Sequence, residues 1–203
     1  MPFQLDKKQQ VKEILKCGKD PAYFLKTYAR ISHPLEGLIL FDTYDFQDTL
    51  STITAGYISW LMLFHRDKSI LVMATKFATA GNLVKKVKSI MKNLPEWIRI
   101  ATISVDNRTS FELSNGSSIK AASTSGDAGR SEALSLLVLD EAAHIEGLEE
   151  LWTGLYPTLS TGGRCIALST PNGVGNWFHK TCIDAESGAN NFNLTTLSWD
   201  VHP

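Results

Sequence analysis

The chain has 203 residues, a hydrophobic fraction of 43% and a charged fraction of 20%, which are ordinary values for a soluble globular protein. They exclude a disordered chain and a collagen, and three cysteines at unrelated spacings indicate neither a disulfide scaffold nor a metal site. The longest apolar run, residues 58–64, is too short to cross a bilayer.

The formal net charge is −1, but the charges are unevenly distributed. Residues 1–100 carry 15 Lys and Arg against 9 Asp and Glu, whereas residues 101–203 carry 5 against 12. A basic first half can face nucleic acid and an acidic second half can face a cation, although ordinary solvated surface explains both.

The first part of the chain is predicted to be helical. Apolar residues recur at helical spacing among lysines and glutamines, and Pro21 suits the start of a second short helix. His33-Pro34 then forces an extended or turn conformation. We therefore expect a short helical N-terminal extension over residues 1–34, and a further helix over residues 54–64.

From residue 69 onward, apolar runs alternate with amphipathic segments. Continuous apolar runs are typical of strands that are buried on both faces of a parallel sheet, and Asn115-Gly116 predicts a hairpin. The pattern favours an α/β fold, in which a mostly parallel sheet has helices on both faces. The expected strands are residues 69–74, 98–105, 110–113, 118–122, 133–139, 165–168 and 193–197, and the expected helices are residues 79–94, 148–156 and 177–185.

The strongest signal for chemistry lies at the end of the strand predicted over residues 133–139. Four apolar residues lead into Asp140-Glu141, which places two carboxylates at the C-terminal edge of the sheet, where open α/β sheets bind ligands. In a nucleotide-hydrolysing site, the first carboxylate holds Mg²⁺ through water and the second polarises the attacking water. A plain polar turn after a strand would contain the same residues.

Two neighbouring loops add polar groups. Ser169, Thr170 and Asn172 follow the next buried strand, where they can sense a γ-phosphate, although a simple Pro-Asn-Gly turn accounts for them as well. Arg130 lies on the loop before the Asp140 strand. It can act as an arginine finger or be an ordinary surface arginine.

Six stretches share one pattern: Tyr23 to Pro34, Tyr44 to Gln47, Ser123 to Ser131, Leu139 to Ala143, Trp152 to Gly163 and Ser169 to Gly173. Together they resemble the ATPase domain of the large terminase subunit of tailed bacteriophages. The resemblance implies a P-loop NTPase-like fold of the ASCE (RecA-like) type that uses ATP and Mg²⁺. It also implies double-stranded DNA as the substrate and a homo-oligomeric ring with the portal protein and the small terminase subunit. The expected location is the procapsid portal in the host cell cytoplasm, with no membrane.

The resemblance also implies roles for individual residues. Glu141 is expected to be the catalytic carboxylate, with Arg130 as an arginine finger acting on a neighbouring subunit. Asp140 is expected on the Mg²⁺ side, together with Ser51. The residues expected to bind the nucleotide are Tyr44, Gln47, Ser51, Thr52, Ser169, Thr170 and Asn172.

The chain departs from the family at the phosphate-binding loop. Residues 51–56 look like the end of a Walker A motif, but they follow Gln47 almost directly, and about 20 residues of the usual strand-and-loop unit are absent. There is no glycine over residues 38–55 and no Lys or Arg over residues 31–65. The cradle of backbone amides and its lysine therefore have no candidate here.

These departures shape the expected domain organisation. Residues 35–203 are expected to form a terminase-like ATPase domain that lacks its P-loop segment near residues 47–51. That absence is expected to leave a gap in the sheet beside the strand that ends at Asp140. The family continues into an RNase H-like nuclease that is absent from the sequence, so we expect a fragment of a packaging ATPase.

Three alternatives stay open at this stage. The chain can be an inactive terminase remnant without ATP hydrolysis, which leaves open whether it is an enzyme. It can be a DNA-binding helper that uses the lysines between Lys85 and Lys92. It can also be part of a superfamily-2 helicase-like ATPase, which shares the stretch from Asp140 to His144, although the chain is too short for a second RecA-like lobe.

Overall fold

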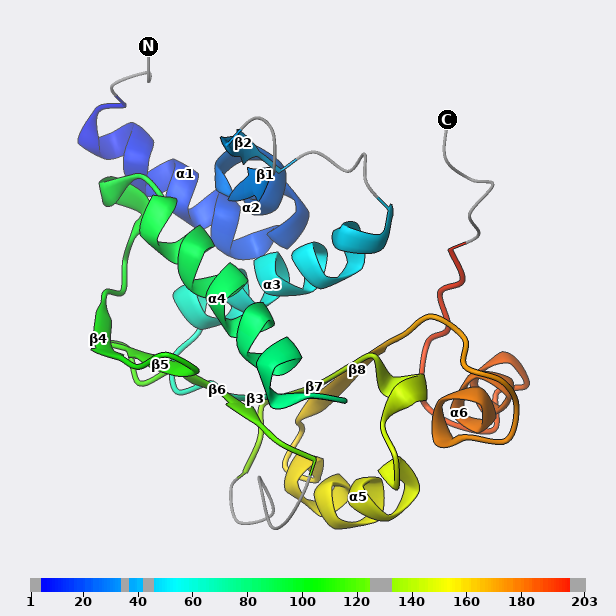
Figure 1. Ribbon diagram of the computed structural model, residues 1–203. Coiled ribbons are helices and arrows are strands. Elements are labelled where there is room, and N and C mark those ends of the chain that lie inside the picture. The colour runs from blue at the N-terminus through cyan, green and yellow to red at the C-terminus, as the bar shows by residue number, and fades with distance from the viewer. Residues whose placement is uncertain (1–4, 34–36, 42–45, 125–132, 198–203) are drawn as a thin grey trace. The chain divides into compact units, whose positions relative to one another are not determined.

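The computed structural model describes residues 5–33, 37–41, 46–124 and 133–197. The chain divides into two compact units. Figure 1 labels their helices and strands. Unit 1 comprises Met1–Lys68 and Leu83–Ser118, and unit 2 comprises Ser69–Asn82 and Ile119–Pro203. In the parts of the chain that the structure describes, no helix is long and apolar enough to span a membrane.

Unit 1 begins with the predicted helical segment, and its two first helices start at aspartate caps. Asp6 accepts a hydrogen bond from the backbone N–H of Gln9 at 2.8 Å, and Asp20 accepts one from that of Tyr23 at 2.9 Å. Pro21 occupies the first turn of the second helix, as expected. The elements are α1 (Lys7–Lys19), α2 (Pro21–Tyr28), β1 (Arg30–His33), β2 (Gly37–Leu40) and α3 (Phe46–Phe64), with β1 antiparallel to β2.

Helix α3 is longer than the sequence predicted. The helix expected over residues 54–64 is present, but it begins at Phe46 and includes the stretch that resembles the end of a Walker A motif. Within α3, a Cβ atom added to Gly56 would lie 1.9 Å from Cδ2 of Leu25. A larger residue at this position would therefore require the side chain of Leu25 to shift.

The remainder of unit 1 contains the end of α4 (Phe77–Asn93), the 3₁₀ helix η1 (Glu96–Ile98), β4 (Ile103–Asp106) and β5 (Ser110–Leu113), which is antiparallel to β4. The expectation of one strand over residues 98–105 is therefore wrong in its first half. The backbone N–H of Ile98 donates to the carbonyl of Pro95 at 3.1 Å, which closes a turn before the strand can begin.

The predicted turn at Asn115-Gly116 is confirmed, and it also caps helix α3. The side-chain Nδ2 of Asn115 donates to the carbonyls of Met62 at 2.8 Å and His65 at 3.2 Å, while its Oδ1 accepts from the N–H of Ser117 at 3.1 Å. These bonds satisfy carbonyls that the end of a helix leaves without partners.

Unit 2 contains most of the parallel sheet, and the expected α/β fold is confirmed. Its strands follow the order β6-β3-β7-β8, and β7 is parallel to both β3 and β8. The elements from residue 69 are β3 (Ser69–Ala74), β6 (Ser118–Ala122), β7 (Leu136–Asp140), η2 (Ala142–His144), α5 (Leu148–Leu155), η3 (Tyr156–Leu159), β8 (Arg164–Leu168) and α6 (Trp177–Glu186).

Two expectations about the strands are wrong. β7 has a hydrogen-bonded neighbour on each side, so no gap lies beside the strand that ends at Asp140, and the parallel part of the sheet ends at β8 instead. Residues 193–197 form no strand. The preceding residue, Phe192, packs against the rings of Trp152 and Trp177, so aromatic contacts rather than strand pairing anchor this segment.

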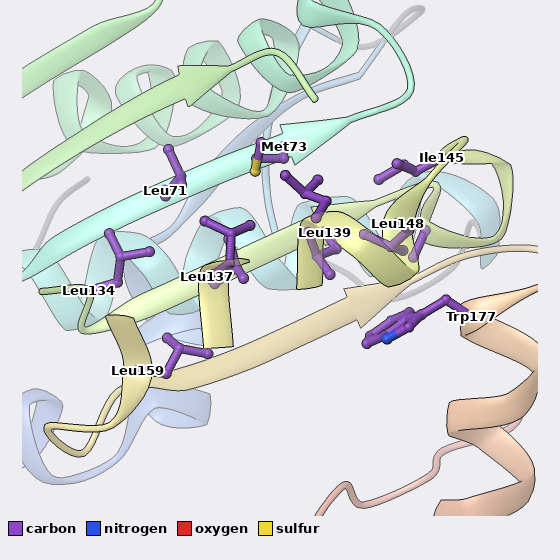
Figure 2. Packing of buried hydrophobic residues seen from close by; sticks show 12 residues of the cluster. Leu71, Met73, Leu134, Leu137, Leu139, Ile145, Leu148, Leu159 and Trp177 are labelled. Carbon is purple, nitrogen blue, oxygen red and sulfur yellow. The ribbon is translucent and has the colours of Figure 1, made fainter. Parts of the chain in front are cut away.

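One face of the parallel strands forms the core of unit 2 (Figure 2). Leucines of β7 meet α5, η3 and the start of α6, and every core residue of this cluster is at most 8% exposed. Burying a leucine side chain contributes about 1.5–3 kcal/mol, so this cluster contributes strongly to the stability of the unit. Its members are Leu71, Met73, Leu134, Leu137, Leu139, Ala142, Ile145, Leu148, Leu151, Leu155, Leu159 and Trp177.

We expect Gly163→Ala to destabilise unit 2 strongly. A Cβ atom at this position would lie 2.1 Å from the carbonyl oxygen of Leu134, and backbone cannot swing aside as a flexible side chain can. The cost should be about 2 kcal/mol or more of unfolding free energy, measured by urea denaturation. Gly162→Ala is the matched control. A Cβ atom at Gly162 would meet open space, so this substitution should cost only the roughly 1 kcal/mol of a left-handed backbone that carries a side chain. Equal costs for the two variants would contradict the close contact.

His65 should make unit 1 sensitive to mild acid. Its Nε2 is buried without a hydrogen-bond partner among the described residues, and burial, with Lys68 nearby, lowers the pKa of the ring. The unfolded chain therefore binds a proton more readily than the folded one, and stability falls as the pH drops below about 6.5. His65→Phe keeps a ring against Trp60 and should lose less stability than the parent between pH 7.5 and 5.5 in urea denaturation. Identical pH profiles would show that His65 does not titrate with unfolding.

Candidate nucleotide site at the edge of the parallel sheet

Three strand ends meet in register in unit 2. Ala74, the last residue of β3, pairs with Asp140, the last residue of β7, and Asp140 pairs with Leu168, the last residue of β8. The residues that follow these strands therefore emerge at one edge, which is where parallel α/β sheets bind ligands. The candidate site is made of Thr75, Asp140, Glu141, Ser169, Thr170 and Asn172.

Asp140 is the least exposed carboxylate of this edge, with 9% of its surface accessible. Its Oδ1 accepts the backbone N–H of Glu141 at 3.1 Å, which fixes the carboxylate at the end of the strand. A nearly buried carboxylate at a strand end is a suitable ligand for a hard divalent cation. No group of three His, Cys, Asp or Glu side chains with metal-site geometry exists among the described residues, so a cation here would need water or ligand oxygens as well.

Glu141 has a left-handed backbone, with φ 55° and ψ 39°. This conformation costs a residue with a Cβ atom about 1–2 kcal/mol and is typical of functional positions. The side chain of Glu141 is exposed, and its Oε2 accepts a hydrogen bond from Oγ1 of Thr75 at 2.6 Å. The backbone and this hydrogen bond together aim the carboxylate along the sheet edge toward the end of β3.

The turn after Glu141 is tied to the loop after β8. The N–H of Ala143 donates to Oγ of Ser169 at 3.1 Å, and Nδ2 of Asn172 donates to the carbonyl of Ala143 at 3.2 Å. His144 Nε2 lies 3.4 Å from Oγ1 of Thr170. A displacement of the loop after β8 would therefore be transmitted to the turn that carries Glu141.

The predicted site residues fall into two groups. The structure brings Asp140, Glu141, Ser169, Thr170 and Asn172 to the single edge described above. Their chemical roles stay predictions.

The expected phosphate-loop residues lie in helix α3 of unit 1. Gln47 and Ser51 are within this helix, and Thr52 is 8% exposed with its Oγ1 accepting from Nζ of Lys86 at 3.4 Å. A metal site that joins Ser51 to Asp140 stays a prediction. Tyr44 and Arg130 lie outside the described residues.

Thr75 is the site residue that the sequence analysis missed. It follows a buried strand directly, as Asp140-Glu141 and Ser169 do, and this shared position was the available signal. The signal was not used because a sequence without strand order does not show which strand ends are neighbours. The order β3-β7-β8 supplies that information.

The lysine face of α4, the basis of the DNA-binding-helper alternative, is partly neutralised. Asp106 Oδ1 lies 2.5 Å from Nζ of Lys88, and its Oδ2 lies 3.0 Å from Nζ of Lys92. Hydrogen bonds from these two lysines lower the pKa of the Asp106 carboxyl, which keeps it charged. Two of the lysines in this stretch therefore already have an anionic partner.

Solved large terminases share this fold. The large terminase ATPase domain of Thermus phage P74-26 is 21% identical, with a TM-score of 0.60 over 68% of this chain and 61% of that one. The large terminase of bacteriophage HK97 is 13% identical, with a TM-score of 0.67 over 85% of this chain and 42% of that one. The large terminase of the thermophilic bacteriophage D6E in complex with ATP-γ-S is 13% identical, with a TM-score of 0.52 over 72% and 36% of the two chains.

At these identities the similarity establishes the fold and nothing finer. The fold implied by the sequence resemblance, that of the terminase ATPase domain, is therefore confirmed. The chain spans less than two thirds of the length of each of these three structures. No protein-family model matches the chain.

We expect the left-handed conformation of Glu141 to reduce the stability of unit 2. Glycine adopts this conformation without the cost that a Cβ atom imposes, whereas alanine keeps the cost. Both Glu141→Gly and Glu141→Ala remove the hydrogen bond from Thr75, so they differ mainly in backbone strain. The glycine variant should have the larger unfolding free energy, by about 1 kcal/mol, in urea denaturation. An alanine variant of equal or greater stability would show that the position is not strained.

Proposed function

We propose that this chain is part of the ATPase domain of a bacteriophage large terminase subunit and serves in the ATP-driven packaging of double-stranded DNA. The observation that carries the proposal is the edge where Asp140, the last residue of β7, and Glu141, directly after it, lie beside the loop with Ser169, Thr170 and Asn172. The fold shared with large terminases supports it. Complexes of the D6E large terminase with ADP and with ATP-γ-S support a nucleotide as the ligand.

In this proposal, each polar side chain of the edge has a distinct task. Asp140 would hold Mg²⁺ through water, and the ion, when bound, would neutralise charge on phosphate oxygens. Glu141 would orient a water molecule and accept its proton. The hydrogen bond from Thr75 would hold the carboxylate in place before the water binds. Ser169 and Asn172, through their bonds to Ala143, would couple the loop after β8 to the turn that carries Glu141.

The residues present fit a magnesium ion better than they fit a triphosphate. Asp140 offers a hard oxygen ligand, but a triphosphate needs a cradle of backbone amides and a lysine. The chain has no glycine over residues 38–55 and no Lys or Arg over residues 31–65. We therefore derive no hydrolysis step for the chain as it stands.

The wider parts of the proposal follow the family. Arg130 would act on the site of a neighbouring subunit in a ring, Tyr44 and Gln47 would contact the adenine, and Ser51 would join Asp140 at the metal. The partners would be double-stranded DNA, the portal protein and the small terminase subunit, at the procapsid portal in the host cytoplasm.

A second candidate is an inactive terminase remnant, and one observation favours it. The stretch that should complete a phosphate loop is part of an unbroken helix, α3, and the hydroxyl of Thr52 already accepts a hydrogen bond from Lys86. In that case the fold would be kept without ATP hydrolysis.

One experiment separates the two candidates. The chain as it stands should show no MgATP binding at micromolar nucleotide in calorimetry, because several phosphate hydrogen bonds of about 1.5–3 kcal/mol each are missing. Insertion of a strand and Walker A loop between Asp48 and Ser51 should restore binding and turnover. An insertion of equal length made of Gly and Ser is the control.

Variants of the restored protein then test the two carboxylates. Glu141→Gln should abolish turnover and leave MgATP binding nearly intact, since general-base catalysis contributes about 10²–10⁴-fold. Asp140→Asn should weaken Mg²⁺-dependent binding. Hydrolysis at the parental rate by Glu141→Gln would show the catalytic assignment to be wrong. A Walker A insertion that restores nothing would favour the remnant.

A further inference from the structure

The outer face of helix α1 carries exposed lysines that have no anionic partner. Lys8, Lys12 and Lys19 are exposed and form no ion pair with any residue that the structure describes. At 100° per residue, these three positions project within about 40° of one another around the helix axis. They differ in this from Lys88 and Lys92 of α4, which share Asp106.

The carboxylates of this region are used elsewhere. Asp6 caps α1, and Asp20 caps α2. Glu13 accepts hydrogen bonds from the hydroxyls of Tyr23 and Tyr28, the latter at 3.0 Å. The solvent face of α1 is therefore left with positive charge alone.

Helix stability does not explain the first of these lysines. Lys8 lies in the first turn of α1, next to Lys7, and that turn contains no acidic residue. A positive charge at a helix N-terminus opposes the helix dipole, whereas Lys16 and Lys19 in the last turn favour it. A lysine that costs local stability is better explained by a ligand of opposite charge.

The inner side of α1 is fixed to the rest of unit 1. Cys17 is fully buried, and its carbonyl accepts a hydrogen bond from Nε1 of Trp60 at 2.9 Å. Lys16 lies over the ring of Tyr23, with 3.5 Å between Nζ and the ring centroid. Helix α1 is therefore held in a fixed position in unit 1. This lowers the entropy cost of binding a ligand through its outer lysines.

We propose that this outer face of α1 contacts the phosphate backbone of duplex DNA. From Lys8 to Lys19 the helix rises about 16 Å, a length along which one DNA strand presents about five phosphates. Val11 and Leu15, 57% and 60% exposed, lie on the same side, but the lysines dominate the face and no acid interrupts them. The proposal rests on the double-stranded DNA partner proposed above and assigns it a surface.

The test is DNA binding without nucleotide, so its result does not depend on the ATP site. A fluorescent 30-base-pair duplex is titrated with the whole chain between 50 and 200 mM salt, and anisotropy gives the affinity. Each phosphate contact contributes about 0.9 to the slope of log K against log salt, so Lys8→Gln with Lys12→Gln should reduce the slope by about 1.8. Because the electrostatic contribution to the affinity vanishes near 1 M salt, the affinity at 50 mM should fall by roughly 200-fold. Glutamine keeps helix propensity close to that of lysine, and a thermal melt checks folding.

Two matched variants locate the effect. Lys180→Gln with Glu149→Gln removes an exposed ion pair between α6 and α5 without changing the net charge and should leave the slope unchanged. Val11→Ala with Leu15→Ala should also leave it unchanged. An unchanged slope after the Lys8 and Lys12 substitutions overturns the proposal, as does a parent chain whose affinity does not depend on salt. Loss of DNA binding in the Val11 and Leu15 variant alone overturns it too, because the affinity would then depend on apolar contacts and not on the lysines.

Recovery of MgATP binding by the inserted Walker A segment, together with failure of α1 to bind DNA, overturns this inference alone. The proposed ATPase assignment would stand in that case. If DNA binding depends on Lys8 and Lys12 but the inserted segment restores no nucleotide site, the inference holds and the hydrolytic function fails.

Discussion

The register of three parallel strands is the constraint on which the candidate site depends. Ala74, Asp140 and Leu168 are paired at the ends of β3, β7 and β8. The core beneath them, filled by leucines of β7 and by α5, holds that register, because a slip by one residue would turn the leucines that pack on α5 to the other face of the sheet. This register alone brings the residues that follow the three strands, Thr75, Glu141 and Ser169, to one edge of the sheet.

The edge combines strain with a dense set of hydrogen bonds. Glu141 has a left-handed backbone, and its carboxylate accepts a hydrogen bond from Thr75. Two residues further on, the backbone N–H and carbonyl of Ala143 form hydrogen bonds with Ser169 and Asn172. The left-handed backbone of Glu141 costs a small amount of free energy, and the hydrogen bonds around it hold its carboxylate in one direction. These hydrogen bonds also join the loop after β8 to the turn that carries Glu141.

The two units differ in the way they manage charge. In unit 1, Asp6 and Asp20 cap helices, Glu13 accepts hydrogen bonds from tyrosine hydroxyls, and Asp106 pairs with lysines of α4. Lys8, Lys12 and Lys19, on the outer face of α1, form no ion pair with any residue that the structure describes. In unit 2 the carboxylates of the sheet edge have little positive charge beside them in the sequence and are suited to a cation. The uneven charge of the two halves of the chain thus corresponds to two chemically different surfaces.

The sequence by itself determined the alternation of strands and helices, the Asn115-Gly116 turn, and the position of Asp140-Glu141 and Ser169 at strand ends. These features depend on local periodicity, turn chemistry and the lengths of apolar runs. Only the tertiary structure decided which strands are neighbours, and it therefore corrected the expected gap beside Asp140 and revealed Thr75 as the partner of Glu141. It also showed that residues 193–197 form no strand, although Phe192 before them packs on Trp152, and that α3 begins at Phe46. Strand order and packing are set by contacts between residues far apart in the chain, and these leave no local pattern in the sequence.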